Sequence, residues 1–239
     1  MKVKNRLLDT NLIIYQDDDW FKFSLDSVLL TKFVTINLRH KKLIDLATGN
    51  APIPLLLSYR TKAKIFGIEY QACVCDLGKQ SVLENKMDEQ IELICDDVRA
   101  LNNRFNSDYF DVVTCNPPYF KTDNKEFLNN NDVKSLARHE VTLTLDDVLK
   151  QASYLLKSGG IFAMVHRTER FIEIIEKMKQ YNIEPKRIQF IYPKKNRESD
   201  LFLIEGIKNG NSGIKMLTPL IVHNDDNTYT DEVLDILNF

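Results

Sequence analysis

The 239-residue sequence contains no apolar run that approaches the roughly 18 to 20 residues a membrane-spanning helix needs. Its first segment, MKVKNRLLDTNLIIYQ, also lacks the long apolar stretch and small-residue cleavage site of a secretory leader. Hydrophobic residues form 44% and charged residues 28% of the chain, a composition typical of a globular domain. We therefore expect a cytoplasmic protein with no membrane segment.

Cysteine spacing suited to metal binding is missing as well. The chain has four cysteines, Cys73, Cys75, Cys95 and Cys115, and they form no C-x-x-C pair and no Cys/His array of the kind that binds zinc. All four lie within apolar stretches, where unpaired cysteine is commonly buried. We expect reduced thiols in the core and no metal site.

Two nucleotide-binding fingerprints are absent around LIDLATGNAPIP, residues 43–54. The G-x-G-x-x-G spacing of dinucleotide-binding loops does not occur, and no Gly-Lys-Ser/Thr follows as in a P-loop. The segment instead reads as an apolar strand, a loop of small residues and a helix opened by Pro52. Such a loop lets the backbone approach a ligand at the carboxyl end of a strand.

Short apolar stretches alternate with helical periodicity along the chain, which predicts βαβ units and a doubly wound sheet. We expect a single domain, 1–239, with a strand and a helix in 1–40 and an α/β core with a mostly parallel, seven-stranded sheet in 41–239. The link KKNRESD is short, which favours an antiparallel strand at one edge. The predicted strands are 42–47, 64–70, 91–95, 110–116, 160–166, 187–193 and 201–208, and the predicted helices are 26–39, 52–60, 71–86, 145–157 and 168–181.

Three consecutive strand ends carry residues suited to an adenosyl-type cofactor. Gly49 follows the first core strand, Glu69 ends the second and Asp97 follows the third. A carboxylate at the position of Glu69 can accept both ribose hydroxyls, and one at Asp97 can accept the exocyclic amine of adenine. Each acid alone could equally be a helix N-cap or a solvated turn residue. Their order along successive strands favours the cofactor site.

The fourth strand ends in Asn116-Pro117-Pro118-Tyr119. The prolines stop the strand, since neither has an N–H to give to a sheet. The stretch resembles the motif of amino-methyltransferases, which implies that the Asn oxygen and a proline carbonyl accept both N–H groups of an adenine amine and stabilise the positive charge that grows on methylation. Tyr119 could stack on the base. A plain proline turn is the alternative.

These motifs resemble known families. Asp-x-Ala-x-Gly-x-Ala (45–51) resembles the first motif of class I S-adenosylmethionine-dependent methyltransferases, with alanine at two glycine positions, and Asn-Pro-Pro-Tyr resembles the motif of amino-methyltransferases. Segments 13–34, 137–170, 193–210 and 219–237 are similar to the bacterial tRNA(Val) adenosine-N6 methyltransferase family. The resemblance implies a Rossmann-like fold and methylation of N6 of adenosine 37 in a tRNA anticodon loop, with S-adenosyl-L-methionine as donor.

The resemblance also implies residue roles. Segment 1–40 would close the cofactor pocket, although Phe23 and Asp26 could instead be a core aromatic and a helix N-cap. The methyl groups of Ala47 and Ala51 are expected to tighten the cofactor loop and to lower affinity without abolishing binding. Asn116, Pro117, Pro118 and Tyr119 would form the catalytic clamp, and the cofactor contacts would be Phe23, Asp26, Asp45, Ala47, Thr48, Gly49, Glu69, Tyr70, Asp97, Val98 and Asn116.

The charge distribution predicts an RNA-facing surface, although the net charge is only −2. Residues 157–197 carry ten Lys and Arg against four Glu, and a local basic patch can bind nucleic acid in a nearly neutral chain. A solvated face is the alternative. The Asn-rich segment 121–137 is predicted to be a mobile loop beside the clamp. The expected RNA contacts are Arg138, His139, Lys186, Arg187, Lys194, Lys195 and Arg197.

Two rival functions remain open at this stage. A protein glutamine methyltransferase acting on release factors would share the clamp, although only about 40 residues precede the first core strand here, fewer than the helical N-terminal domain of that family would need. An RNA-binding protein that retains an inactive methyltransferase core is the second rival. The sequence does not fix the oligomeric state, and we favour a monomer.

Overall fold

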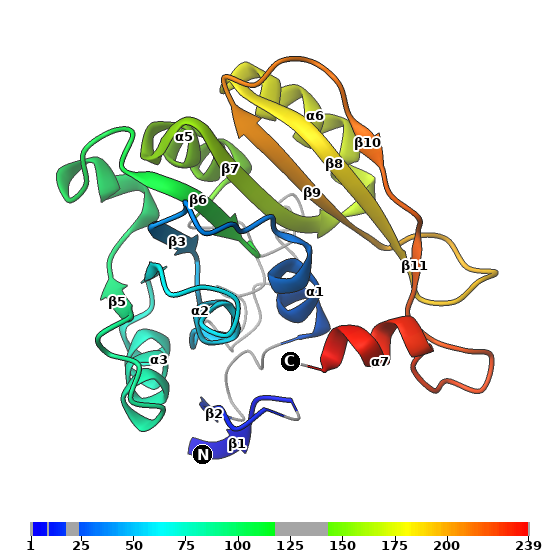
Figure 1. Ribbon diagram of the computed structural model, residues 1–239, viewed down its shortest axis with the longest axis horizontal. Helices are drawn as coiled ribbons and strands as arrows, with labels where there is room; N and C mark the ends of the chain where they lie inside the picture. Colours follow the sequence, from blue (N-terminus) through cyan, green and yellow to red (C-terminus); the bar gives the residue numbers. More distant parts are fainter. Residues whose placement is uncertain (1, 9, 18–23, 118–142, 239) are drawn as a thin grey trace, which may run out of the picture.

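The computed structural model describes residues 2–8, 10–17, 24–117 and 143–238. Its main sheet runs in the order β8-β9-β7-β6-β3-β4-β5, with two short strands, β10 and β11, paired with β8 (Figure 1). The strands of this sheet are β3 (Lys42–Leu46), β4 (Lys64–Glu69), β5 (Ile91–Cys95), β6 (Phe110–Cys115), β7 (Leu156–Arg167), β8 (Ile183–Tyr192), β9 (Leu201–Lys208), β10 (Lys215–Met216) and β11 (Leu220–Ile221).

The seven longer strands confirm the predicted doubly wound, mostly parallel sheet. β9 is antiparallel to both of its neighbours, β7 and β8, and therefore lies one place in from the predicted edge. The chain runs outward from β3 through β4 to β5 and then returns to β6 on the other side of β3. The switch point thus lies between β3 and β6, where ligands bind in open α/β sheets.

Alternate residues of each central strand point to two separate hydrophobic cores. Leu43 and Val112 belong to the core under α1 (Leu25–Phe33), α2 (Pro52–Leu57), α3 (Ala72–Glu84) and α7 (Asp231–Leu237). Ile44 and Val113 belong to the core under α5 (Leu145–Leu155), α6 (Phe171–Gln180) and the 3₁₀ turn η1 (Val98–Asn103). A second short turn, η3 (Thr168–Arg170), follows β7. Because both faces are covered, these strands carry the nearly continuous apolar runs seen in the sequence.

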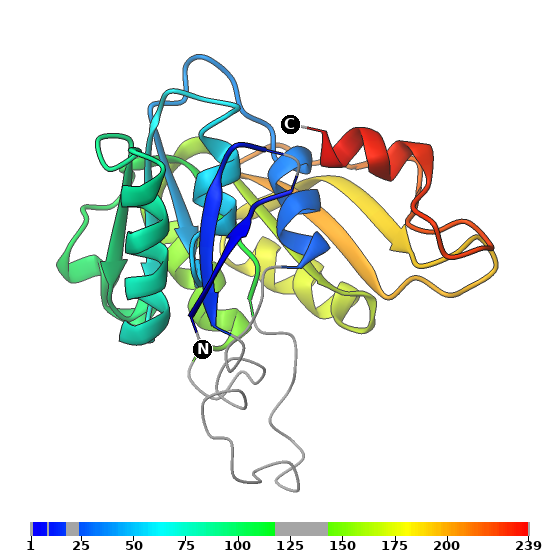
Figure 2. The ribbon, with the colours of Figure 1, turned by 90° about the horizontal axis from the view of Figure 1, so that it is seen from below.

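The first 40 residues hold more structure than the predicted strand and helix. β1 (Lys2–Arg6) and β2 (Ile13–Asp17) form an antiparallel hairpin that precedes α1 (Figure 2). The Tyr15 N–H donates to Ser81 Oγ of α3 at 2.9 Å, and the Tyr15 carbonyl accepts from Asn50 Nδ2 at 2.9 Å. Asn50 belongs to the loop after β3, so the hairpin is anchored directly to the predicted cofactor loop.

The cysteines differ from the sequence-based expectation. Cys75 on α3 and Cys95 at the end of β5 form a disulfide, with a Cα–Cα distance of 5.8 Å. Cys73 is an exposed free thiol, and Cys115 is a buried one. The expectation of a reduced core thiol therefore holds for Cys115 alone, where burial raises the pKa of the thiol well above its ordinary value. Sequence spacing could not show that α3 brings Cys75 against the end of the neighbouring strand.

The described residues contain neither a membrane-spanning helix nor a metal-binding cluster. Among the helices of residues 2–8, 10–17, 24–117 and 143–238, none is long and apolar enough to cross a membrane. The same residues contain no group of three or more His, Cys, Asp or Glu side chains that could hold a metal ion.

Candidate active site

The carboxyl ends of β3, β4, β5 and β6 bring four predicted residues, Gly49, Glu69, Asp97 and Asn116, to one edge of the sheet. The loop 47–51 follows β3, and its Thr48 N–H donates to the Ile68 carbonyl of β4 at 2.8 Å. The Asp96 N–H donates to the Glu69 carbonyl at 3.1 Å, which joins the ends of β4 and β5. Asn116 directly follows β6, the neighbour of β3 on the other side. These contacts form a continuous row of strand ends across the switch point.

The loop 47–51 is shaped by three residues with left-handed backbones. Ala47, Gly49 and Ala51 have φ angles of 54°, 59° and 71°. Glycine adopts this conformation without a steric penalty, whereas an L-residue with a Cβ does not. The two alanines therefore strain the backbone at the positions where the motif usually has glycine. A Cβ added to Gly49 would meet no atom within 4 Å, so this residue borders open space at the carboxyl edge.

Asp45 supports this loop from beneath. The side chain is fully buried, and its two oxygens accept hydrogen bonds from Thr48 Oγ1 and Thr114 Oγ1, both at 2.6 Å. Burial raises the pKa of the Asp45 carboxyl to about 7, against the lowering effect of the two hydroxyl donors. Asp45 thus joins β3, β6 and the loop, and its direct contact with a cofactor stays a prediction.

Glu69 lies at the bottom of the predicted ribose site. One carboxylate oxygen accepts from the Gly49 N–H and the other from the Gln71 N–H, both at 2.9 Å. Glu69 is buried, and burial raises the pKa of its carboxyl above the ordinary value. Tyr70, the next residue, is exposed. The two backbone donors fix the carboxylate orientation, while each oxygen keeps a second lone pair for a ligand hydroxyl.

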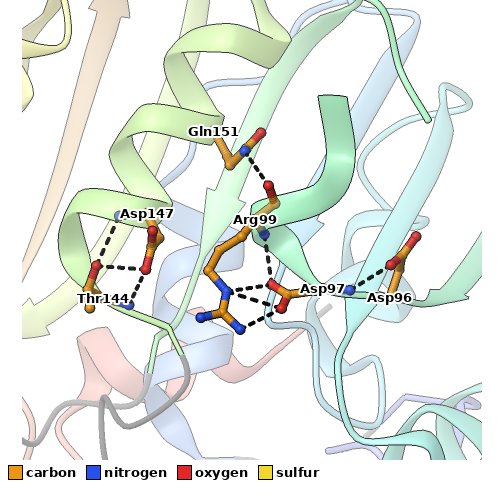
Figure 3. Close-up of polar contacts among 6 residues, drawn as sticks. All are labelled: Asp96, Asp97, Arg99, Thr144, Asp147 and Gln151. Atoms are coloured by element: carbon orange, nitrogen blue, oxygen red, sulfur yellow. Dashed lines mark hydrogen bonds and ion pairs between the residues drawn. The ribbon is translucent and has the colours of Figure 1, made fainter. Parts of the chain in front are cut away.

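Asp97 forms an ion pair that sequence reasoning missed. Its carboxylate caps η1 by accepting from the Arg99 N–H at 2.8 Å, and the Arg99 guanidinium contacts both oxygens, with Nη2 2.6 Å from Oδ2 (Figure 3). Arg99 lowers the pKa of the Asp97 carboxyl. Gln151 of α5 donates to the Arg99 carbonyl at 3.0 Å. Val98, which stands between Asp97 and Arg99 in the sequence, is buried. The only hint of this ion pair in the sequence is that an arginine stands two residues after the acid. Whether the arginine side chain points at the carboxylate depends on the backbone of the turn η1.

Asn116 contacts the first turn of α1. Its side-chain Nδ2 donates to Ser27 Oγ at 3.1 Å, and Ser27 is buried. Pro117 is also buried, whereas Asp26, which precedes Ser27 in α1, is half-buried. Ser27 lies 89 positions from Asn116, so no local sequence pattern could select it. Phe23, Pro118, Tyr119, Arg138, His139 and the segment 121–137 lie outside the described residues.

The predicted basic stretch divides into two separate groups. β8 is parallel to β7, so the loop 193–200 after it lies at the carboxyl edge, where Lys194, Lys195 and Arg197 form what we call the β8–β9 cation group. The Lys194 Nζ donates to the Asp225 carbonyl at 3.0 Å. Lys186 and Arg187 belong to the first half of β8, away from that edge.

Arg187 does not form part of an exposed basic surface. Its Nη1 lies 3.1 Å from Glu205 Oε1 and 2.6 Å from Thr35 Oγ1, and its guanidinium stacks over Phe33 at 4.7 Å. The Glu205 side chain is only 5% exposed, and removing one partner of a buried ion pair leaves the other charge uncompensated. Arg187 is therefore a structural residue that joins β8, β9 and the segment after α1, and its expected role in RNA binding is not supported.

Comparison with known proteins identifies the family of this site. Residues 37–214 match the family model described as a methyltransferase domain. The chain belongs to this family. It is therefore an enzyme of the methyltransferase class, as predicted, and the roles of the residues at the strand ends stay predictions.

The chain is similar to several proteins named tRNA1(Val) (adenine(37)-N6)-methyltransferase. It is 26% identical to one from Bacteroides thetaiotaomicron over 223 residues, which cover 91% of each chain. It is 28% identical to one from Bacteroides fragilis over 152 residues, or 64% of this chain and 62% of the relative's length. A protein from Photobacterium profundum is 25% identical over 76% of this chain and 75% of its own length.

Solved structures share the fold. A predicted O-methyltransferase from Agrobacterium tumefaciens superposes with a TM-score of 0.72 at 21% identity, over 89% of this chain and 95% of its own. Geranyl diphosphate methyltransferase in complex with SAM gives 0.58 at 13% identity, over 76% of this chain and 84% of its own. These neighbours show the fold, and the second of them was solved with SAM bound.

Proposed function

We propose that this methyltransferase transfers the methyl group of S-adenosyl-L-methionine to N6 of adenosine 37 in the anticodon loop of a tRNA1(Val)-type tRNA. The observation that carries the proposal is Asn116 at the carboxyl end of β6, beside the cofactor loop that follows β3. The substrate is supported by the names of the relatives from Bacteroides and Photobacterium. We further propose a monomeric, single-domain, cytoplasmic enzyme, since tRNA is a cytoplasmic substrate.

The residues at the strand ends fit the donor. Gly49 leaves open space where any other residue would place a Cβ, so the backbone can approach a ligand closely. Glu69 presents a buried, oriented carboxylate for the ribose hydroxyls. The Asp97 carboxylate is half-buried and bound by Arg99, so an adenine amine would have to share it with that guanidinium. When bound, S-adenosyl-L-methionine supplies an electrophilic methyl group on its sulfonium. The chain's own contribution is to align that group with the attacking nitrogen.

The target nitrogen needs help because its lone pair is delocalised into the adenine ring. In this proposal Asn116 Oδ1 and the Pro117 carbonyl accept the two N–H groups of the amine, which favours a tetrahedral nitrogen. The same oxygens stabilise the positive charge that develops as the nitrogen–methyl bond forms and the sulfur–methyl bond breaks. The methylated amine then loses a proton readily, so no strong general base is required. Stacking by Tyr119 and RNA contacts by Arg138 and His139 stay predictions.

The tRNA must present its adenosine outside the loop stack. A base in a folded anticodon loop has to be splayed out to enter such a site, and the protein must hold the surrounding phosphates. The β8–β9 cation group lies at the same edge as Asn116, because β8 and β6 both run parallel to β7. We propose that these three side chains bind phosphates of the anticodon arm.

The test uses tritiated S-adenosyl-L-methionine with three candidate acceptors in parallel: unmodified tRNA, a release factor and DNA. We expect label in tRNA, and digestion to nucleosides should place it in N6-methyladenosine. Label in the release factor would replace our proposal with the glutamine methyltransferase. Absence of label from all three would favour an RNA-binding protein with an inactive core.

The Asn116→Ala variant tests the clamp itself. We expect the single-turnover rate of methyl transfer to fall by about a hundred- to a thousandfold, the usual effect of removing one preorganised transition-state contact. The dissociation constant for S-adenosyl-L-methionine, measured by calorimetry, should change little because Asn116 is not placed at the ribose or adenine contacts. Wild-type rates in this variant would mean that the segment is only a turn.

A further inference from the structure

Two buried side-chain polar atoms of the N-terminal extension have no hydrogen-bond partner among the described residues. They are Gln16 Nε2, near the end of β2, and Ser24 Oγ, directly before α1. In the same part of the chain, the only other such atom is Gln151 Oε1. Burying a donor without a partner destabilises the folded state, so a group of this kind commonly marks a place where a ligand or an ordered water binds.

Gln16 is buried with one half of its amide engaged. Its side chain lies on the same face of β2 as the core residue Ile14, and it is 4% exposed. Gln16 Oε1 accepts from Asn5 Nδ2 of β1 at 3.1 Å, while Nε2 keeps its N–H groups for another partner. Turning both amides over would keep this contact and leave Oε1 without a partner instead. One polar atom of the buried amide is therefore available in either arrangement.

Strand β2 leads to the predicted cofactor loop. Its first residue donates to Asn85 Oδ1 at the end of α3 at 2.8 Å, and Tyr15 donates to Ser81 Oγ, one turn earlier in that helix, at 2.9 Å. β2 thus runs antiparallel to α3, toward the carboxyl edge of the sheet where α3 begins. The Tyr15 carbonyl accepts from Asn50 Nδ2 of the loop after β3 at 2.9 Å. Gln16, the next residue, therefore lies beside this loop.

Ser24 lies at the same edge, at the N-terminus of α1. It occupies the N-cap position, but its side chain makes no capping hydrogen bond to the described helix, although an N-cap serine ordinarily accepts one. Its carbonyl accepts from the Ser27 N–H at 3.2 Å, and Ser27 Oγ lies 3.1 Å from Asn116 Nδ2. Ser24 is thus one helical turn from a contact with the end of β6. The positive end of the α1 dipole also lies here and favours a carboxylate.

The predicted placement of the donor brings its amino-acid end to this region. Adenine is predicted at the end of β5, ribose at the end of β4 and the transferred methyl group at Asn116 after β6, and the strand order is β6-β3-β4-β5. The sulfur that joins the ribose to the methyl group therefore lies over the end of β3. The amino-acid end is the third substituent of the same sulfur, and it carries a carboxylate and an ammonium.

We propose that Gln16 Nε2 and Ser24 Oγ bind the amino-acid end of S-adenosyl-L-methionine, and that the carboxylate of this end accepts the Gln16 N–H. The inference rests on the proposed function, since it uses the same donor in the same placement. A ligand end with both a carboxylate and an ammonium satisfies the Gln16 amide in either orientation. Asp26, the acidic residue in the first turn of α1, suits the ammonium. The two residues hold the donor and do not touch the target amine.

The first experiment compares two ligands that differ only in this end. S-adenosyl-L-homocysteine carries the amino-acid end on its sulfur, whereas 5′-methylthioadenosine carries a methyl group there. Gln16→Met keeps the length of the side chain and removes the amide. By calorimetry, we expect this variant to raise the Kd for S-adenosyl-L-homocysteine at least tenfold, the effect of losing one hydrogen bond to a charged group. Its Kd for 5′-methylthioadenosine should change by less than about twofold.

Two further variants complete the comparison. Ser24→Ala should also weaken S-adenosyl-L-homocysteine selectively, by about threefold or more, and it decides the question if Gln16→Met does not fold. Asn85→Ala is the matched control, because it removes the hydrogen bonds of 2.8 and 2.6 Å that anchor the start of β2 and leaves Gln16 in place. This control should lower the melting temperature and leave the ratio of the two Kd values unchanged.

A purely structural role of Gln16 would give a different pattern. The ligand-free Gln16→Met protein should melt at or above the temperature of the wild type, because it no longer buries an unpartnered N–H. A lower melting temperature with equal weakening of both ligands would mean that Gln16 only supports the hairpin, and it would overturn the inference. Unchanged affinity for both ligands would mean that the N–H binds only an ordered water, which would overturn it too.

The wild type provides the last check. It should bind S-adenosyl-L-homocysteine more tightly than 5′-methylthioadenosine, and equal affinities would show that the amino-acid end has no site here. These measurements use no RNA, so their failure would leave the proposed tRNA methylation standing. A failure to label tRNA would refute the proposed function whatever the two ligands show.

Discussion

Replacing Asp45 by asparagine should change how the stability of this protein depends on pH. The carboxyl is fully buried beneath the cofactor loop, and burial raises its pKa to about 7 from an ordinary value of 3.8. The folded protein therefore holds a proton on Asp45 between about pH 4 and pH 7, where the unfolded chain has already lost it. Stability from this group falls as the pH rises through that interval, because folding must then either bind a proton or bury a charge.

The magnitude follows from the shift. Each pKa unit is worth about 1.4 kcal/mol, so a shift from 3.8 to about 7 corresponds to roughly 4 kcal/mol once the pH lies well above 7. When this pH dependence is integrated from pH 5 to pH 8, the free energy of unfolding of the wild type should fall by about 2.5 kcal/mol more than that of an Asp45→Asn variant. The asparagine can keep both contacts, since its oxygen accepts from one threonine hydroxyl and its Nδ2 donates to the other.

Urea unfolding of both proteins at pH 5, 6, 7 and 8 measures this difference. Glu69 also has a raised pKa, so the wild-type curve alone would combine two groups, and the difference between the two proteins isolates Asp45. We expect the unfolding free energy of the variant to rise steadily relative to that of the wild type as the pH increases. At pH 8 the variant should be the more stable protein. A free-energy difference that stays constant from pH 5 to pH 8 would refute the raised pKa.

Three further predictions concern the edge of the site. Replacing the whole β8–β9 cation group by alanine should reduce the slope of log K for tRNA binding against log salt concentration by up to about 2, at roughly 0.7 per phosphate contact. The control variant Lys62→Ala, at the opposite edge of the sheet, should leave this slope unchanged. Equal slopes for the two variants would show that the β8–β9 cation group does not bind tRNA phosphates. Gly49→Ala should lower the free energy of unfolding by only about 1 kcal/mol, because a Cβ strains the left-handed backbone at this position. The same change should weaken S-adenosyl-L-methionine binding, measured by calorimetry, at least tenfold. An unaltered affinity would mean that the open space beside Gly49 is not the cofactor site. Under oxidising conditions Cys95→Ser should lower the free energy of unfolding by about 3 kcal/mol, because the bond to Cys75 is lost. Adding a reductant should lower the unfolding free energy of the wild type to the same value. A wild-type stability that does not respond to reductant would contradict the disulfide.

Much of the fold was predictable because its signals are local. The apolar runs ending at Glu69 and Cys115 identified buried parallel strands, and the proline pair after Asn116 marked where one of them stops. The boundaries of α3 and α5 agree with the predicted helices to within two residues. The hairpin partner β1 was missed, since its pairing with β2 forms only in the folded chain.

The site divides in the same way. Carboxyl ends of parallel strands meet at one edge of a sheet, so the order Gly49, Glu69, Asp97, Asn116 sufficed to place four residues together. The ion pair between Arg187 and Glu205 was missed because nothing near either residue in sequence shows that they lie opposite each other on two antiparallel strands.

What the sequence determined by itself is the alternation of strands and helices and the residue types at the strand ends, since periodicity and turn chemistry act over a few neighbouring positions. Only the tertiary structure decided which distant side chains meet. It joined Cys75 to Cys95, set Gln151 against the Arg99 carbonyl and set Ser27 against Asn116. Such pairs depend on how α1, α3 and η1 pack on the sheet, and packing is a property of the whole chain.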